Sequence, residues 1–259
     1  MGYRSNKTRV IETTLSAIVV VVLAAAAGRA GAADPDTLRK IVLDRCVPNQ
    51  IAHQSPLPCA KVDLSGGVAR GHAVLKDLVG ATQYLVLPTI ALSGIESPEL
   101  LAPGAPNYFA AAWRERGFTE RAVGHALPRD AISLAINSQY ARTQNELHIH
   151  VDCIRADVRA ALRQQQAAIG DAWRPLAQRL SGHRYLARRV LGDDLAQDPF
   201  RLVADGIPGA RADMAAHTIV VVGAEFAGRP GFVVLDNGER HGGEELQDHS
   251  CALAASWSS

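Results

Sequence analysis

The chain has 259 residues, of which 47% are hydrophobic and 20% are charged, enough to bury a sizeable core in one domain or in two small ones. Its formal net charge of +1 lacks the basic excess of nucleic-acid-binding proteins, and its 5% aromatic content argues against a surface that stacks bases. We therefore expect no nucleic-acid partner.

Residues 1–33 differ in character from the rest of the chain. Basic residues at positions 4, 7 and 9 precede an apolar run at residues 15–28, and an Ala-Gly-Ala triplet follows it. This order is typical of a secretory signal, and the run is short for a bilayer span, which needs about 20 apolar residues. The segment is therefore either a cleaved signal or an uncleaved membrane anchor, and in both cases residues 34–259 form an exported domain.

After residue 34, short helical and strand patterns follow one another, which predicts an α+β fold. The expected helices are residues 36–44, 107–116, 157–177 and 199–205, and the expected strands are residues 74–77, 83–88, 131–137, 144–153, 183–190, 218–222 and 231–235. A loop is expected at residues 46–59. The second half of the chain weakly repeats the order of the first, so we also consider a degenerate internal duplication.

The four cysteines fit an oxidising compartment. Cys46 and Cys59 bracket a proline-rich stretch with little core of its own, where a disulfide would contribute about 3 kcal/mol. Cys153 and Cys251 remain and could form a second bridge. We favour this pairing, although four cysteines allow three connectivities and buried free thiols are the alternative.

Two histidines stand one residue apart inside an alternating run, which predicts a strand with one buried face. The polar face carries Gln144, Glu146, His148, His150 and Asp152, and the apolar face carries Leu147, Ile149, Val151 and Cys153. Five polar side chains on one face contribute little to stability. This face is therefore the candidate functional site.

Three interpretations of the histidine pair compete. The first is two hydrogen-bonded histidines on a half-exposed strand. The second is a Zn²⁺ site, because His148 and His150 lie about 7 Å apart at Cβ on one face; Glu146, Asp152 or His249 would supply a third ligand.

The third interpretation is nucleophilic catalysis at phosphorus. A neutral imidazole attacks phosphoryl groups, and its ordinary pKa of about 6.5 leaves it mostly neutral at pH 7. The second imidazole would hold a non-bridging oxygen or transfer a proton. Just before the strand, Arg142, Thr143 and Gln144 supply a guanidinium, a hydroxyl and an amide for phosphate neutralisation.

The hairpin at residues 133–151, with Leu147-His148-Ile149-His150 at its end, resembles the histidine-triad superfamily of nucleotide hydrolases and transferases. Residues 76–88 resemble that superfamily's first nucleotide-binding hairpin. Within the superfamily, the chain is similar to the bacterial CDP-diacylglycerol pyrophosphatase family, and the resemblance extends from residue 36 to the C-terminus. The segments that carry it are residues 38–42, 46–59, 74–78, 94–98, 147–150 and 246–251.

This resemblance implies a histidine-triad-like antiparallel sheet with flanking helices and the hydrolysis of CDP-diacylglycerol to CMP and phosphatidate. The triad's middle histidine is the nucleophile and matches His148, the third matches His150, and Glu146 replaces the first. His148 would form a cytidylyl-histidine that water resolves. Phosphatidate, whose second pKa is about 6, leaves without strong acid catalysis, so a Glu146→His variant is expected to keep its turnover.

The resemblance also implies further substrate-binding residues. Asn137, Arg142, Thr143 and Gln144 are expected near the phosphates and Asp77 near the ribose, with His249 in reach if Cys153 pairs with Cys251. No metal and no other cofactor is expected. The diacyl tails favour an enzyme held at the bacterial inner membrane by its N-terminal segment, with its catalytic domain in the periplasm, or exported after signal cleavage.

Two alternatives stay open. One is an exported metal-binding or lipid-binding module that uses His148 and His150 as ligands. The other is a broader nucleotide pyrophosphatase or transferase with the same site.

Overall fold

The structure is a computed structural model that describes residues 1–2 and 34–252. The chain divides into two units, residues 1–33 and 34–259. The signal or anchor expected at the N-terminus lies outside the described residues. Within the residues that are described, no helix combines the length and the apolar character that crossing a membrane would require.

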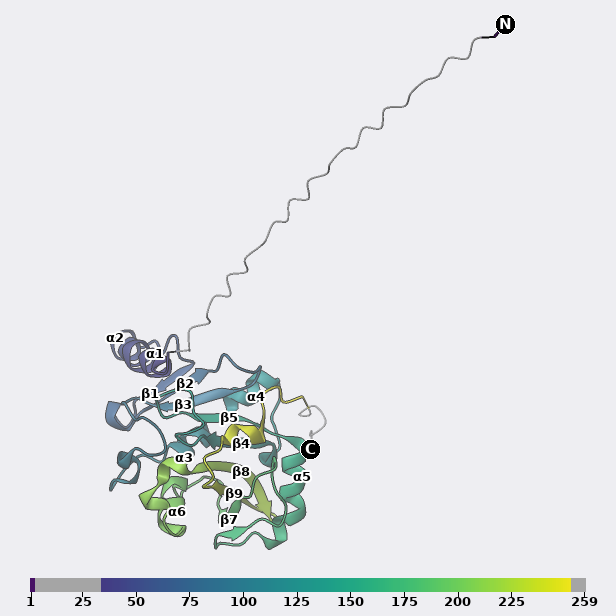
Figure 1. Ribbon diagram of the computed structural model, residues 1–259. Helices are drawn as coiled ribbons and strands as arrows, with labels where there is room; N and C mark the ends of the chain where they lie inside the picture. Colours follow the sequence, from purple (N-terminus) through teal and green to yellow (C-terminus); the bar gives the residue numbers. More distant parts are fainter. Residues whose placement is uncertain (3–33, 253–259) are drawn as a thin grey trace. The chain divides into compact units, whose positions relative to one another are not determined.

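One large antiparallel sheet organises the second unit (Figure 1). Its strand order is β1-β2-β3-β5-β4-β8-β9-β7-β6, and β10 pairs with the end of β5. The strands are β1 Lys61–Asp63, β2 His72–Lys76, β3 Tyr84–Pro88, β4 Ile132–Ile136, β5 Ile149–Ile154, β6 Arg174–Pro175, β7 Leu186–Leu191, β8 Thr218–Phe226, β9 Arg229–Asn237 and β10 Gln247–Asp248. The predicted combination of an antiparallel sheet with a few helices is confirmed.

Short helices cover both faces of the sheet. They are α1 Thr37–Ile41, α2 Val47–His53, α3 Tyr108–Arg114, α4 Gly117–Val123, α5 Ala156–Gln165 and α6 Pro199–Gly206. On one face α3 and α6 form the main core with Ile149 and Val151 of β5. On the other face there are two separate clusters, one beneath α5 and one between α1, α2 and the β1–β3 strands. On this second face, a strip of the sheet therefore lies between the helix α5 and the pair of helices α1 and α2.

Several predicted elements are confirmed with small shifts. The strands expected around Gly80 are β2 and β3, which pair in register Leu75↔Leu85. The helix expected at residues 107–116 is α3, where the Asn107 side chain accepts a hydrogen bond of 2.9 Å from the Ala110 amide as an N-terminal cap.

Three predictions were wrong in extent. The strand expected at residues 144–153 is β5, which begins only at Ile149. The stretch at residues 46–59 is helical up to His53, because Pro48 lies in the first turn of α2, where its missing N–H costs no hydrogen bond. The helix expected to reach residue 177 ends at Gln165. A short 3-10 helix at Gln166–Ala168 follows, and beyond it the Gly170 carbonyl accepts a hydrogen bond of 2.7 Å from the Arg189 amide of β7.

Both favoured disulfides are present. Cys46–Cys59 ties α2 to the start of β1, and Cys153–Cys251 ties β5 to the segment that follows β10. The second bridge joins residues 98 positions apart and fixes the end of the described chain to the histidine strand.

Candidate active site

His150 interrupts an apolar row that crosses the sheet. The register places Leu85 of β3 and Ala135 of β4 on either side of His150, and Val220 of β8 beyond Ala135. Leu85 belongs to the cluster under α1 and α2, whereas Ala135 and Val220 belong to the cluster under α5. The histidine therefore occupies the strip between the two helical covers, where a polar side chain can face a ligand.

His148 precedes β5 by one residue and is 7% exposed. Its Nδ1 lies 2.6 Å from the backbone carbonyl of Glu146, and because a carbonyl only accepts, Nδ1 carries the proton. Nε2 therefore keeps its lone pair. Burial lowers the pKa of His148 below its ordinary value, so the imidazole is neutral at pH 7.

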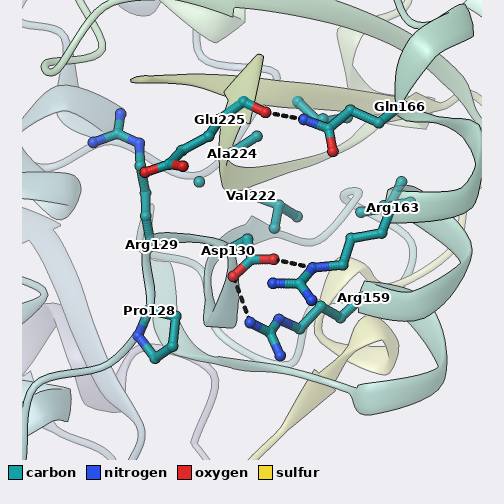
Figure 2. A pocket seen from close by; sticks show the side chains of 12 residues that line it. Pro128, Arg129, Asp130, Arg159, Arg163, Gln166, Val222, Ala224 and Glu225 are labelled. Atoms are coloured by element: carbon teal, nitrogen blue, oxygen red, sulfur yellow. Dashed lines mark hydrogen bonds and ion pairs between the residues drawn. The ribbon is translucent and has the colours of Figure 1, made fainter. Parts of the chain in front are cut away.

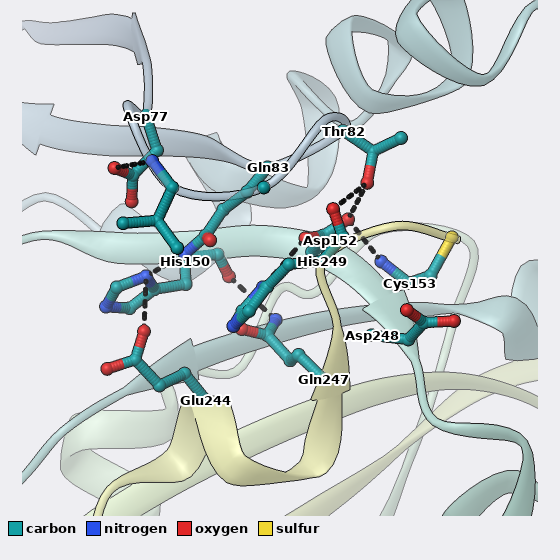
Figure 3. A network of polar contacts seen from close by, with 12 residues as sticks. Asp77, Thr82, Gln83, His150, Asp152, Cys153, Glu244, Gln247, Asp248 and His249 are labelled. Atoms are coloured by element: carbon teal, nitrogen blue, oxygen red, sulfur yellow. Dashed lines mark hydrogen bonds and ion pairs between the residues drawn. The ribbon is translucent and has the colours of Figure 1, made fainter. Parts of the chain in front are cut away.

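His150 packs edge-on against His148, with ring centroids 4.9 Å apart. Its Nδ1 contacts the Gln83 side-chain amide and lies 3.4 Å from the Glu244 carboxylate (Figure 3). Donation by the Gln83 amide leaves the proton on His150 Nε2, a buried atom for which the described residues offer no hydrogen-bond partner. Burial, together with the neighbouring His148 and His249, lowers the pKa of His150 well below its ordinary value.

A histidine–aspartate pair borders the same face. Asp152 is fully buried, and its Oδ2 lies 3.0 Å from Nδ1 of His249, while Oδ1 accepts from the Thr82 hydroxyl at 2.7 Å (Figure 3). The hydrogen bond to Asp152 raises the pKa of His249, and burial raises the pKa of Asp152. His249 thus adds a cation-forming group beside the two buried imidazoles.

Glu146 points away from this face. The Nε of Arg39, on α1, lies 2.7 Å from its carboxylate, and the Leu92 amide donates to it at 3.3 Å. Burial raises the pKa of Glu146, an effect that Arg39 opposes. The carboxylate at the altered triad position is therefore engaged by an arginine, and only the Glu146 backbone carbonyl serves the histidines.

Arg142 reaches the site from behind the loop at Gly94. Its Nη1 lies 2.5 Å from Glu96, and a Cβ added at Gly94 would fall 2.2 Å from that nitrogen, so a side chain at position 94 would displace the guanidinium. The Arg142 Nε is buried with no hydrogen-bond partner within residues 34–252. The positive charge also contributes to lowering the pKa of His148.

The other expected substrate-binding residues lie at different distances from the histidines. Asn137 accepts from the Gly243 amide at 2.7 Å and donates to Glu244 at 2.8 Å, so it holds the loop that presents Glu244. Asp77 lies at the end of β2, near enough to influence the pKa values of His148 and His249. Thr143 is exposed, and Gln144 binds the backbone of Asp34 and Leu38 instead of pointing along β5.

Gln83, Arg39 and Glu244 were not among the predicted site residues. Each reaches β5 or the residues just before it from a distant part of the chain, and none belongs to a local pattern. The strand expected after Gly80 was the one available signal. Gln83 lies two residues before Leu85, so the alternation of that strand places both side chains on the same face.

Metal ligation by the histidine pair finds no support in the side-chain geometry. Among the described residues, three groups bring potential ligand atoms within 4.8 Å of one another: Asp152 with Cys153 and Cys251, His183 with Glu239 and His241, and Asp63 with His72 and Glu115. None contains His148 or His150. The first includes a disulfide, whose sulfurs are not thiolates.

A cavity of about 610 Å³ lies elsewhere, between α5 and strands β8 and β9 (Figure 2). Arg159 and Arg163 both bind Asp130 there, at 2.6 and 2.5 Å, and Arg129 donates to backbone carbonyls. The lining contains none of the histidines described above.

Comparison with known families identifies the family of the chain. A family model described as CDP-diacylglycerol pyrophosphatase matches residues 33–255, which includes every residue of the histidine face. The chain therefore belongs to the CDP-diacylglycerol pyrophosphatase family, and it is a hydrolase of CDP-diacylglycerol.

Proposed function

We propose that the chain cleaves the diphosphate of CDP-diacylglycerol in two steps, with His148 as the nucleophile. The observation that carries this proposal is the 2.6 Å contact between His148 Nδ1 and the Glu146 carbonyl. It fixes the tautomer whose Nε2 lone pair is free, and burial keeps that imidazole neutral. A neutral and oriented imidazole is the form that nucleophilic catalysis requires.

In the first step, His148 Nε2 attacks the phosphorus joined to cytidine, and a P–N bond forms while the bond to the bridging oxygen breaks. Phosphatidate leaves with the electron pair and gives CMP attached to His148. In the second step, water attacks the same phosphorus, the P–N bond breaks, and His148 regains its lone pair. The released proton passes to solvent or to a neighbouring imidazole.

The groups around His148 supply charge rather than strong acid catalysis. His150 Nε2–H donates to a non-bridging oxygen, since it is a buried donor that no described residue uses. His249, whose pKa is raised by its hydrogen bond to Asp152, and Arg142 balance the negative diphosphate. Phosphatidate, with a second pKa of about 6, then leaves without needing a full proton.

The site supports a variant of the histidine-triad arrangement. The strand carries the second and third histidines of the pattern, and the first is replaced by Glu146, whose carboxylate binds Arg39. In this proposal the missing imidazole is compensated from outside the strand by His249. The duplication considered from the sequence has no role in this mechanism.

The proposed site of action is the exported side of a bacterial inner membrane. Residues 1–33 would either tether the hydrolase domain there or be removed after export. Both outcomes leave the domain on the same side of the bilayer as its lipid substrate.

The test uses CDP-diacylglycerol labelled with ³²P on the cytidine-side phosphorus in a rapid-quench experiment. The expected result is an acid-labile protein adduct that forms and decays within one turnover and is absent from His148→Ala. The exposed His125 provides a matched control, and His125→Ala should keep both adduct and turnover. Full hydrolysis by His148→Ala would overturn the assignment of the nucleophile.

Hydrolysis in ¹⁸O-labelled water locates the attacked phosphorus. Attack at the cytidine side places the label in CMP, as the proposal requires. Label in phosphatidate would show that water or an enzyme group attacks the other phosphorus, and the order of steps given above would be wrong.

A further inference from the structure

A turn beside the active site exposes two aliphatic side chains. Leu78 is 100% exposed and Val79 is 62% exposed, whereas most other aliphatic side chains within residues 34–252 are buried. Both lie in the turn that joins β2 to β3, directly after Asp77. Two adjacent large aliphatic side chains at the tip of one turn form a small contiguous apolar surface, which is a feature of interaction sites.

Hydrogen bonds hold the backbone of the turn in a conformation that exposes its tip. The Asp77 carboxylate accepts a hydrogen bond of 3.0 Å from the Val79 amide. The Lys76 ammonium donates to the carbonyls of Asp77 and Gly80, at 2.9 and 3.0 Å. These bonds close the turn on its polar side and leave Leu78 pointing outward.

The same turn forms one wall of the histidine site. A Cβ at Gly80 would lie 2.5 Å from Cβ of His249, and the Ala81 amide donates to the His249 carbonyl at 2.9 Å. Asp77, one residue before the exposed pair, contributes to the pKa values of His148 and His249. The apolar tip and the catalytic imidazoles are therefore parts of one continuous surface.

A third exposed aliphatic residue lies at the same end of the strands. β1 and β2 pair in register Lys61↔Val74, so the residues before β1 and after β2 lie at one end of the pair. Leu57, which is 65% exposed, precedes β1 at this end. The β1–β2 connection, with the exposed Val68, lies at the opposite end.

We propose that the Leu78–Val79 turn docks the enzyme on the surface of a lipid bilayer that contains its substrate. This inference rests on the lipid substrate of the proposed function, but not on the identity of the nucleophile. The diacylglycerol chains stay in the bilayer while the diphosphate must reach His148. Aliphatic side chains next to the site enter the interfacial region and bring the histidines to the level of the lipid headgroups.

The turn carries one lysine and one aspartate, Lys76 and Asp77, and only the lysine attracts an anionic lipid surface. Lys76 lies at the base of the tip, and its ammonium group is directed at the turn carbonyls instead of a carboxylate. CDP-diacylglycerol and phosphatidate are both anionic lipids. A short apolar tip with a basic residue at its base is the combination that binds such a surface reversibly.

The test compares two substrates, and it compares variants at the two opposite ends of the β1–β2 pair. The full chain is assayed on phosphatidylcholine vesicles that contain CDP-diacylglycerol, and on a soluble cytidine diphosphate ester of glycerol without acyl chains. The double variant Leu78→Asp/Val79→Asp should lose about tenfold or more of its rate on vesicles and keep its rate on the soluble ester within about twofold. Val68→Asp should change neither rate.

A fluorescence experiment measures docking directly. Leu78→Trp should add an emission component that shifts to the blue when vesicles are added, and Val68→Trp should not. Unchanged vesicle hydrolysis in the double variant would overturn the docking proposal, as would an equal loss on both substrates. Failure of the unaltered chain to hydrolyse either substrate would instead overturn the proposed function on which the docking rests.

Discussion

Substitution of Arg39 by methionine leaves the Glu146 carboxylate buried without its cation. Removing one partner of a buried ion pair typically costs about 3–5 kcal/mol, and because the Arg39 side chain is 33% exposed we expect about 2–4 kcal/mol. For a domain of this size each kcal/mol lowers the melting temperature by about 2–4 °C. Arg39→Met should therefore lower the melting temperature by roughly 5–15 °C, as measured by circular dichroism.

The pH dependence of this loss follows from the same burial. Burial already raises the pKa of Glu146 in the folded protein, and removal of Arg39 raises it further. A carboxyl group whose folded pKa exceeds its unfolded value of about 4.3 destabilises the fold at pH values above that unfolded pKa. The cost of Arg39→Met should therefore be small near pH 4 and reach its full size at pH 8.

A double-mutant cycle with Glu146→Gln isolates the pair. The neutral amide keeps the shape of the side chain and removes the charge that Arg39 stabilises, so Arg39→Met should cost clearly less in the Glu146→Gln background. Equal costs in the two backgrounds would refute the reasoning. Glu146→His, which the sequence alone suggested would be tolerated, would place an imidazole against the Arg39 guanidinium and should be destabilising.

Three further predictions concern the site and its supports. Neutral His148 and protonated His249 should give kcat/KM a bell-shaped pH profile. Its acid limb should lie below pH 6.5 because burial lowers the pKa of His148, and its alkaline limb above pH 6.5 because Asp152 raises the pKa of His249. Asp152→Asn should move only the alkaline limb to lower pH, and an unmoved limb would contradict the assignment of His249. Replacing Cys153 and Cys251 with alanine should cost about 4–5 kcal/mol in urea unfolding and most of the activity, whereas replacing Cys46 and Cys59 should cost about 3 kcal/mol and leave the rate on the soluble ester largely intact. Dialysis against EDTA should not change the rate of CDP-diacylglycerol hydrolysis; a loss that added Zn²⁺ restores would favour a metal role for the histidine face.

The sequence predicted those parts of the fold in which one residue pattern dominates. The alternation from Leu147 to Cys153 predicted both the strand and its buried face, because one side of β5 packs in the main core. The helix after residue 156 was predicted too long, because Gly170 is a weak signal and the chain there pairs with β7. The proline at position 48 suggested a loop, although a first helical turn accepts it equally well.

The site was predictable as a set of histidines but not as a network. His150 and Asp152 lie on β5 and His148 directly precedes it, so local spacing was sufficient to group them. The partners of His150 and Asp152 come from the β2–β3 turn and from the segment after β9, and the partner of Glu146 comes from α1, at separations that no local pattern encodes. The role of Glu146 in particular depends on Arg39, which lies 107 positions earlier in the chain.

Because β10 pairs with β5, the segment around β10 completes the polar side of the histidine strand. Glu244, Gln247 and His249 belong to the last part of the described chain, and Gln247 bonds both Ser133 and the His150 carbonyl. Without this segment β5 would still pair with β3 and β4, but its polar side would lack Glu244, Gln247 and His249. In the proposed mechanism hydrolysis therefore depends on residues 244–249 as well as on the histidine strand.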